Sequence, residues 1–311
     1  MKELTDFQRK VAEFCPNIRL QNNEPMAKHT SFRIGGEAEV MAFPCSIAEI
    51  SQLLKVSRLL DRTPAILGAG TNVLAPDEGI SGLVICLKDG MDGMERLRGN
   101  AIRVGAGVTM TRAAMFAAKQ GLSGLEFAHG IPGTVGGGVY MNAGAYGGEI
   151  SDICKGVRVM DMEGNLHDFT RDEMDFSYRH SRLEAMPGIV LDAVFALMPM
   201  ETDQIMAKMK ELMAKRSASQ PLDLPSAGSA FKRPVGGYAA ALIENAGLKG
   251  FQVGGAAISQ KHAGFAVNLG GATAHDVEML LAQVSERVYE KSGIRLEPEI
   301  RVWSVPKKGA V

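Results

Sequence analysis

Apolar residues recur along this chain with two periods, and each period predicts one kind of element. Apolar positions three and four residues apart predict amphipathic helices, expected at 1–14, 46–60, 111–121, 200–221, 238–247 and 273–293. Short apolar or β-branched runs that end near Gly or Pro predict strands, expected at 38–44, 65–74, 82–87, 101–107, 156–164, 166–170, 188–199, 256–259, 263–269 and 295–305. Strands and helices mix without a regular βαβ period, which favours an α+β fold over a doubly wound parallel one.

Two of the expected helices carry detailed signals. Ser46 with Glu49 three residues later predicts a capping box at the start of the helix at 46–60. The helix at 273–293 places one set of apolar residues on a single side, which predicts its buried face: Val277, Leu280, Leu281, Val284 and Val288.

The length of the chain indicates two domains. Its 311 residues with 46% hydrophobic content suffice for one large core, but two smaller cores are more usual at this size. The division is expected at 199/200, giving a domain at 1–199 and a smaller α/β domain at 200–311. The end of the helix expected at 200–221, residues 217–221, is the best candidate for a linker.

Composition excludes several classes of partner. The net charge is -1, which gives no reason to expect nucleic acid or an anionic membrane surface. Four widely spaced cysteines form no C-x-x-C pair, so neither a disulfide framework nor a thiolate zinc site is indicated. We find no signal peptide and no apolar run long enough to span a bilayer, and we therefore expect a soluble, cytoplasmic protein.

Common catalytic motifs are absent. The chain has no G-x-S-x-G elbow, no G-x-x-x-x-G-K-[ST] loop and no histidine spacing typical of a metal site, so we predict no catalytic metal. The sequence Gly68-Ala69-Gly70 comes directly after the apolar residues 65–67, but Val73 stands where a dinucleotide fingerprint has its third glycine. This departure argues against a standard Rossmann site.

Three glycine-bearing segments remain, at 30–36, 67–74 and 127–150. The third, FAHGIPGTVGGGVYMNAGAYGGEI, is one-third glycine without being low-complexity. Each glycine alone is explained by a tight turn. Together with Ser, Thr and Asn, however, such bare backbone can surround a pyrophosphate without a compact P-loop. The three segments predict a dinucleotide bound along the backbone.

At this point the sequence resembles a known family. The motifs HTSFRIGG, GAGTNVL, GIPGTVGGGVYMNAGAYGGEI, FSYRHS, AGSAFKRP, AALIENAGLKG, GGAAISQKHAGFAVN and LEPEIRV occur in this order. They are similar to those of the UDP-N-acetylenolpyruvoylglucosamine reductases of bacterial peptidoglycan synthesis. Thr71 replaces a common Ser, and no long insertion separates Arg179 from Ile189, so the chain resembles the shorter subtype, which lacks an extra tyrosine loop.

The resemblance implies a fold, cofactors and a reaction. The fold would be an FAD-binding domain of the vanillyl-alcohol oxidase and p-cresol methylhydroxylase type, at about 33–197, followed by a C-terminal substrate domain. The cofactors would be non-covalent FAD and NADPH. The enzyme would reduce UDP-N-acetylglucosamine enolpyruvate to UDP-N-acetylmuramate, and so serve cell-wall synthesis, cell shape and division. We expect a monomer.

The same resemblance implies three catalytic residues. Arg179 would hold the substrate carboxylate and the charge that develops beside it, because a guanidinium stays protonated and forks onto carboxylates. Ser229 would donate the proton, and Glu299 would stabilise the charge as a protonated acid. From the residues alone, Arg179 is more simply a surface ion pair and Ser229 a turn or cap residue.

Glu299 has a competing interpretation. Alternation in the predicted strand 295–305 puts Leu296, Ile300 and Val302 on one face, and Glu297, Glu299 and Arg301 on the other. Spacing alone therefore favours a carboxylate on the solvent side of a strand. The catalytic interpretation requires that this polar face lines the substrate site.

The remaining site residues also follow from the motifs. Tyr178 and Lys232 are expected to contact the UDP-sugar phosphates, with Asn268 in the same pocket, although Lys232 could equally be a solvated charge. The expected FAD contacts are Arg33, Gly35, Gly36, Gly68, Gly70, Thr71, Asn72, Gly130, Ile131, Pro132, Gly133, Thr134 and Gly137.

Two other functions are possible on the same residues. An FAD-dependent oxidase would share the flavin fold but is expected to lack AGSAFKRP and LEPEIRV. A non-catalytic nucleotide-sugar-binding protein would have no reason to keep Arg179, Ser229 and Glu299 together.

Overall fold

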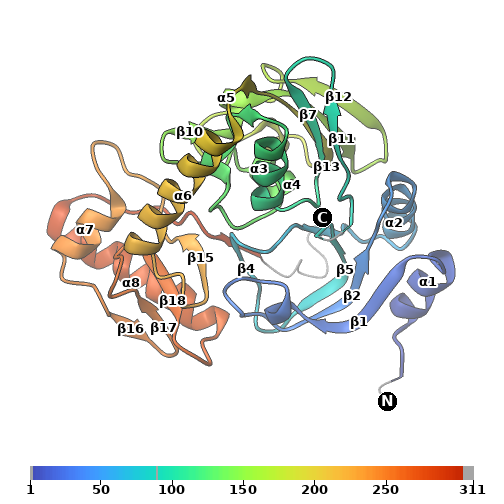
Figure 1. The fold of residues 1–311 in the computed structure, drawn as a ribbon. Coiled ribbons are helices and arrows are strands. Elements are labelled where there is room, and N and C mark those ends of the chain that lie inside the picture. Colours follow the sequence, from blue (N-terminus) through green and yellow to red (C-terminus); the bar gives the residue numbers. More distant parts are fainter. Residues whose placement is uncertain (1–2, 89, 304–311) are drawn as a thin grey trace. The chain divides into compact units, whose positions relative to one another are not determined.

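The computed structural model describes residues 3–88 and 90–303 (Figure 1). Its packing divides the chain into two units. The first unit comprises 1–22, 40–69 and 82–215, and the second comprises 23–39, 70–81 and 216–311. The second unit thus takes in two N-terminal segments besides the C-terminal region. The boundary expected at 199/200 stays a prediction.

The first unit is built on two sheets. One has the strand order β1-β2-β5-β3, and the other has the order β12-β11-β13-β7-β6. In the second sheet all neighbours are antiparallel. The strands of the two sheets are β1 Arg19–Pro25, β2 Glu37–Phe43, β3 Ala65–Leu67, β5 Ile80–Cys86, β6 Met94–Leu97, β7 Ala101–Gly105, β11 Cys154–Asp161, β12 Leu166–Thr170 and β13 Gly188–Ala196.

Helices and short strands complete this unit. The helices are α1 Asp6–Phe14, α2 Ile47–Leu59, α3 Met110–Lys119, α4 Val135–Tyr140, α5 Ile150–Ile153 and α6 Thr202–Ser219, with 3-10 turns η2 Glu126–Ala128 and η3 Arg182–Glu184. The short strands form two pairs, β8 Leu122–Ser123 with β14 Met198–Pro199, and β9 Gly144–Ala145 with β10 Gly148–Glu149. The capping box expected for α2 forms only in part: Ser46 accepts from the Glu49 N–H, but the Glu49 carboxylate accepts from the N–H of Cys45.

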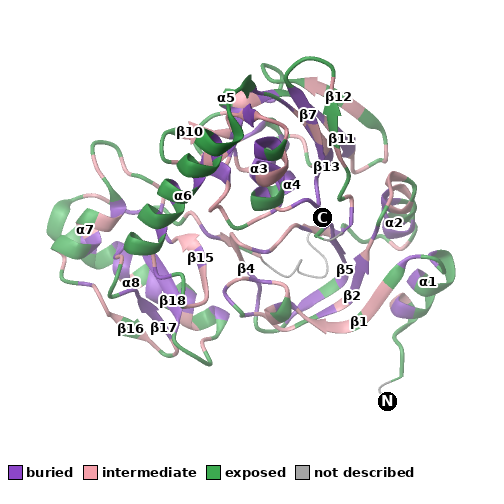
Figure 2. Ribbon diagram, viewed as in Figure 1, coloured by how far each residue is buried: buried purple, intermediate pink, exposed green. Residues whose placement is uncertain are grey.

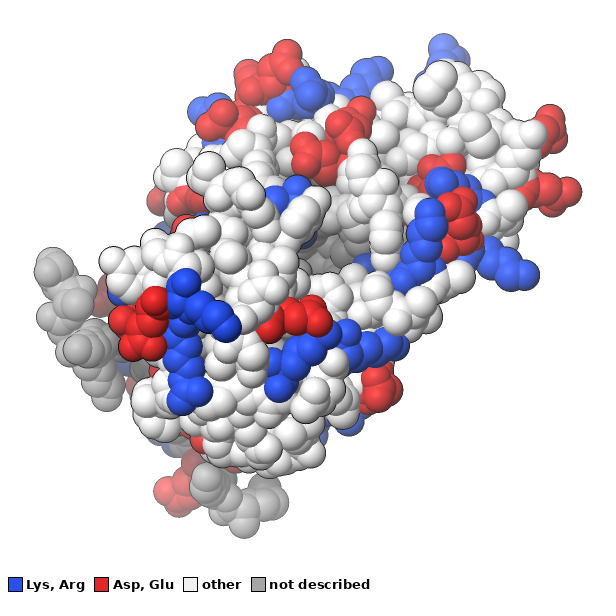
Figure 3. Space-filling view, turned by 90° about the vertical axis from the view of Figure 1, so that its left-hand side faces the viewer, with Lys and Arg blue, Asp and Glu red and all other residues white. Residues whose placement is uncertain are grey.

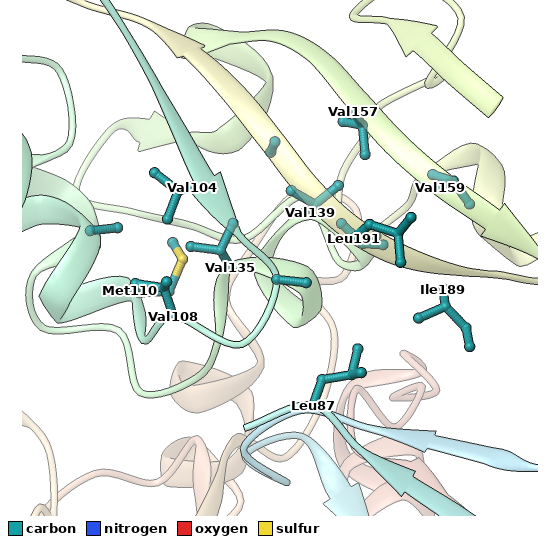
Figure 4. Close-up of a cluster of buried hydrophobic side chains, with 14 of the residues drawn as sticks. Leu87, Val104, Val108, Met110, Val135, Val139, Val157, Val159, Ile189 and Leu191 are labelled. Atoms are coloured by element: carbon teal, nitrogen blue, oxygen red, sulfur yellow. The ribbon is translucent and has the colours of Figure 1, made fainter. Parts of the chain in front are cut away.

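A buried cluster joins α4 to the antiparallel sheet. Figure 4 shows Val135 and Val139 of α4 among side chains of β7 and β13, including Val104 and Leu191. All four side chains are buried. Burial of such apolar surface drives folding, so this core fixes the helix that follows the loop of the glycine-rich stretch.

The second unit has its own core. Its four-stranded sheet has the order β15-β18-β17-β16, with antiparallel neighbours throughout. Buried residues along β17 and β18 appear purple in Figure 2. The elements are η1 Met26–Lys28, β4 Val73–Leu74, β15 Ser226–Ser229, α7 Ala239–Asn245, β16 Gln252–Val253, β17 Ala256–Ile258, β18 Phe265–Asn268, α8 Ala274–Ser292 and β19 Arg301–Val302. All five residues predicted to form the buried face of α8 are buried.

The last predicted strand is largely wrong. Only β19, Arg301–Val302, is a strand, and it pairs in parallel with β4. Pro298 has no N–H for a ladder, and it makes a single bridge with Phe231. Leu296 and Ile300 are buried as expected, but Val302 is 45% exposed. Of the strand predicted at 295–305, residues 304 and 305 lie outside the described part.

Candidate active site

The glycine-rich stretch begins as a loop held on the strand-to-helix connection at 106–110. The Met110 N–H donates to the Gly133 carbonyl at 3.0 Å, and the Val135 N–H donates to the Val108 carbonyl at 2.8 Å. Gly136 approaches the same connection so closely that an added Cβ would lie 2.9 Å from the Cβ of Ala106. Some glycines of this stretch therefore permit tight packing of α4.

Part of the expected FAD contact set gathers in this unit. Gly68 packs directly on Thr134, because a Cβ on Gly68 would lie 2.5 Å from the Thr134 hydroxyl oxygen. Thr134 is buried and caps α4, accepting from the Gly137 N–H at 3.4 Å. The expected contacts in this unit are Gly68, Gly130, Ile131, Pro132, Gly133, Thr134 and Gly137.

The other expected FAD contacts lie in the second unit. The Ser31 N–H donates to the Gly70 carbonyl at 3.0 Å, which joins the first glycine-bearing segment to the second. Gly70 has φ +60, and a Cβ there would overlap the His29 carbonyl oxygen. The expected contacts in this unit are Arg33, Gly35, Gly36, Gly70, Thr71 and Asn72. Arg33 is exposed.

Ser229 and Glu299 lie on neighbouring segments of the second unit. The Glu299 N–H donates to the carbonyl of Ala230, the residue after Ser229, at 2.9 Å. The Asn72 amide donates to the Glu299 carbonyl at 3.3 Å. Both Ser229 and Glu299 are half-buried. Two expected catalytic residues and one expected FAD contact are therefore brought together.

The same pair of segments positions Lys232. Its N–H donates to the Glu297 carbonyl at 2.8 Å, and its ammonium group forms an ion pair with the Glu297 carboxylate. Asn268 is buried, and its amide is occupied by backbone groups, donating to the Phe32 carbonyl and accepting from Gly270 and Ala272. These bonds already engage both ends of its amide. A substrate role for Asn268 stays a prediction.

Arg179 lies at the tip of a tight turn in the first unit. Ser177 and His180 close the turn with two backbone hydrogen bonds, of 3.1 and 3.2 Å. Tyr178 and Arg179 are its central residues, with the Arg179 guanidinium 5.4 Å from the centre of the Tyr178 ring. Tyr178 is 50% exposed, whereas Arg179 is half-buried.

The structure draws attention to two residues of the glycine-rich stretch that were not among the expected site residues, Asn142 and His129. Asn142 is buried and donates to the Ser177 carbonyl at 3.0 Å. His129 lies in the loop at the start of the stretch, where burial lowers its pKa. An Asn among glycines was the available signal for Asn142, because Asn tolerates positive φ.

The described residues contain no further centre built from metal-binding groups. In the part of the chain that is described, no cluster of His, Cys, Asp and Glu could hold a metal ion, and no helix is long and apolar enough to cross a membrane. The face in Figure 3 carries Lys and Arg beside Asp and Glu.

Comparison with known proteins identifies the family. An FAD binding domain model matches residues 38–170, and a model of the UDP-N-acetylenolpyruvoylglucosamine reductase C-terminal domain matches 220–303. A UDP-N-acetylenolpyruvoylglucosamine reductase of Agathobacter rectalis is 46% identical over 307 residues, covering 95% of this chain and 98% of the relative. One of Latilactobacillus sakei is 45% identical over 287 residues, covering 92% and 93%.

A solved structure agrees with these matches. The crystal structure of the UDP-N-acetylenolpyruvylglucosamine reductase of Thermus caldophilus has a TM-score of 0.77 and 35% identity, covering 93% of this chain and 99% of that one. The expected α+β fold, an FAD-binding domain followed by a C-terminal domain, is confirmed. With its FAD-binding region and its C-terminal region both matched, the chain belongs to the UDP-N-acetylenolpyruvoylglucosamine reductase family.

Proposed function

We propose that this chain reduces UDP-N-acetylglucosamine enolpyruvate to UDP-N-acetylmuramate, with FAD as its cofactor and NADPH as the source of reducing equivalents. The observation that carries the proposal is the hydrogen bond from the Glu299 N–H to the carbonyl of Ala230, which brings the segment of Glu299 beside the residue that follows Ser229. A proton donor and a second acid beside it are what reduction of an enol ether requires.

The residues present fit FAD. Gly130 and Gly133 are half-buried, and within the described residues their N–H groups have no hydrogen-bond partner. Unpaired N–H groups on a glycine loop are suitable donors to a pyrophosphate. The cofactor would be held by the expected contacts of the first unit, which are Gly68 and those from Gly130 to Gly137, and by those of the second unit, in the loops at 33–36 and 70–72. The chemistry that FAD supplies when bound is hydride transfer from NADPH to the terminal alkene carbon.

Each catalytic side chain then has a separate task. The Arg179 guanidinium pairs with the substrate carboxylate and stabilises the negative charge that develops beside it. The Ser229 hydroxyl gives its proton to the carbon that carries this charge. No hydrogen-bond partner engages that hydroxyl among the described residues, so it can turn toward substrate. Glu299, when protonated, donates a hydrogen bond to the same carboxylate and disperses its charge.

Tyr178 and Lys232 bind the other end of the substrate. The Tyr178 ring is exposed beside Arg179, and the Lys232 ammonium group can pair with a diphosphate. Lys232 already forms an ion pair with Glu297. Because the Lys232 and Glu297 side chains are 41% and 69% exposed, the pair contributes little, about 0 to 1 kcal/mol, and a diphosphate can displace the carboxylate.

The test separates the two half-reactions. Ser229→Ala should leave reduction of the bound flavin by NADPH near the wild-type rate and slow reduction of the enolpyruvyl substrate at least about 10²-fold, as expected for loss of a proton donor. Glu299→Gln should act in the same direction. Ser226→Ala, in the same strand β15, is the matched control and should slow neither step. Equal slowing of both half-reactions by Ser229→Ala would show that Ser229 is structural.

A further inference from the structure

We propose that Asn142 is a positioning residue that holds the turn carrying Arg179. The inference rests on the function proposed above, in which Arg179 binds the substrate carboxylate. It assigns a second task to the glycine-rich stretch, whose loop is expected to bind FAD: the stretch also fixes the position of a catalytic side chain.

The Asn142 amide bonds to two other segments of the first unit, one with Glu149 and Ser151 and one with Ser177. Its nitrogen donates to the Glu149 carboxylate and to the Ser177 carbonyl, both at 3.0 Å. Its oxygen accepts from the Ser151 N–H at 2.9 Å. The residue is 1% exposed. All the hydrogen atoms of the amide are therefore used, and none of its bonds faces solvent.

The partners determine the orientation of this amide. If the oxygen and nitrogen were exchanged, the oxygen would face a carboxylate and a carbonyl, and the NH₂ group would face the Ser151 N–H. Each of these contacts would be repulsive. Glu149 is itself held, since it also accepts from the Ser151 hydroxyl at 2.5 Å. The Asn142 amide therefore presents its N–H to the Ser177 carbonyl in a fixed orientation.

The turn depends on this donor because its conformation is strained. Arg179 has φ +56, a left-handed conformation that costs energy for any residue with a Cβ. Such a conformation persists only where the surroundings hold it. The Ser177 carbonyl accepts from His180 within the turn and from Asn142 outside it, so both of its lone pairs are filled.

A second bond anchors the other end of the turn to the same stretch. The Ser181 hydroxyl donates to the Tyr140 carbonyl at 2.7 Å, and Ser181 is fully buried. The turn is therefore attached before and after Arg179 to residues two apart, Tyr140 and Asn142. Loss of either attachment would let the guanidinium shift, and a shift of about 1 Å at a reacting centre costs about 10² in rate.

Asn142→Asp tests the inference without new backbone strain. Asn142 has φ +42, a conformation that Asp also tolerates. The substitution removes both N–H donors and sets a second carboxylate against Glu149. The kcat/KM for the enolpyruvyl substrate should fall about 10²-fold, while reduction of the flavin by NADPH stays unchanged. The matched control is Asn165→Asp, which places the same charge beside Asp161 in another turn of this unit and should leave both steps unchanged.

A double-mutant cycle separates positioning from general damage. In an Arg179→Ala background, Asn142→Asp should cost less than about twofold, because the side chain that it positions is gone. The same loss in both backgrounds would overturn the inference. If Arg179→Ala alone left the reaction unchanged, the role proposed for Arg179 would fall, and the inference with it.

A second readout does not depend on activity. Proteolysis proceeds through local opening of the chain, so Asn142→Asp should raise the rate of trypsin cleavage after Arg179 several-fold, mapped by mass spectrometry. Unchanged cleavage, with Asn165→Asp as the reference, would show that Asn142 does not hold the turn.

Discussion

Gly70→Ala should destabilise the protein far more than the same substitution at Gly247. Both glycines lie in the second unit and have positive φ, +60 and +76. A left-handed conformation costs an alanine about 1–2 kcal/mol at either site. At Gly247 an added Cβ meets nothing within 4 Å. At Gly70 it would overlap the His29 carbonyl oxygen and lie 2.9 Å from the Thr30 Cα.

The overlap involves backbone, which cannot rotate away as a side chain can. Overpacking of this kind adds about 1–3 kcal/mol, so the total loss at Gly70 should be about 2–5 kcal/mol, against about 1–2 kcal/mol at Gly247. Because Thr71 and Asn72 follow Gly70 directly, Gly70→Ala should also weaken FAD binding at least about tenfold, or ~1.4 kcal/mol.

Urea unfolding followed by circular dichroism gives the free energies, and FAD titration of the apoprotein gives the affinity. Equal destabilisation by Gly70→Ala and Gly247→Ala would refute the packing argument. Loss of stability at Gly70 without loss of FAD affinity would refute the assignment of the loop at 70–72 to the cofactor.

Three further predictions concern charged side chains. Arg179→Gly should be about 0.5–1 kcal/mol more stable than Arg179→Ala in urea unfolding, since relief of the left-handed conformation exceeds the entropy that glycine adds to the unfolded chain; equal stability would contradict the strain. Burial opposes ionisation of Asp161, but hydrogen bonds, led by that from His167, outweigh it and lower its pKa to about 2. The ionised side chain therefore stabilises the fold above about pH 4, the unfolded value, and this contribution is lost as the pH falls toward 2; unfolding free energies measured from pH 5 downward should fall less steeply in Asp161→Asn, and an unchanged slope would contradict this account. Glu297→Gln releases Lys232 and should lower KM about twofold with kcat unchanged, whereas a loss of kcat in steady-state assays would shift the catalytic role to Glu297.

Local sequence signals correctly predicted the elements whose pattern of apolar residues corresponds to the face that they bury. The helix at 273–293 was predicted almost to the residue because its apolar face and its caps agree: Thr273 caps the start of α8, and Gly293 caps its end with φ +72. In contrast, β1 at Arg19–Pro25 was missed, because its mostly polar sequence carries no strand period. Its pairing with β2 arises from tertiary context, which propensity does not report.

The last segment shows where periodicity misleads. Alternation around Pro298 suggested a long strand, but a residue without an N–H cannot continue a ladder. The burial of Leu296 and Ile300 was nevertheless predicted correctly, because it depends on the apolar pattern alone. Glu299, assigned by spacing to the solvent side, is half-buried on the segment next to Ser229.

The expected site residues came from motifs, and the contacts among them could not have come from the sequence. Asn142 and Ser177 are 35 residues apart in the chain, and no local pattern signals a hydrogen bond over that separation. The role proposed for Asn142 appears only when the amide and the turn are seen in one structure.

The most direct test of the proposed function is anaerobic mixing of the NADPH-reduced protein with UDP-N-acetylglucosamine enolpyruvate, followed in the visible flavin band. We predict return of the oxidised flavin spectrum, with one UDP-N-acetylmuramate formed for each flavin oxidised. A spectrum that stays reduced until oxygen is admitted, with no UDP-N-acetylmuramate formed, would contradict the account and indicate an oxidase.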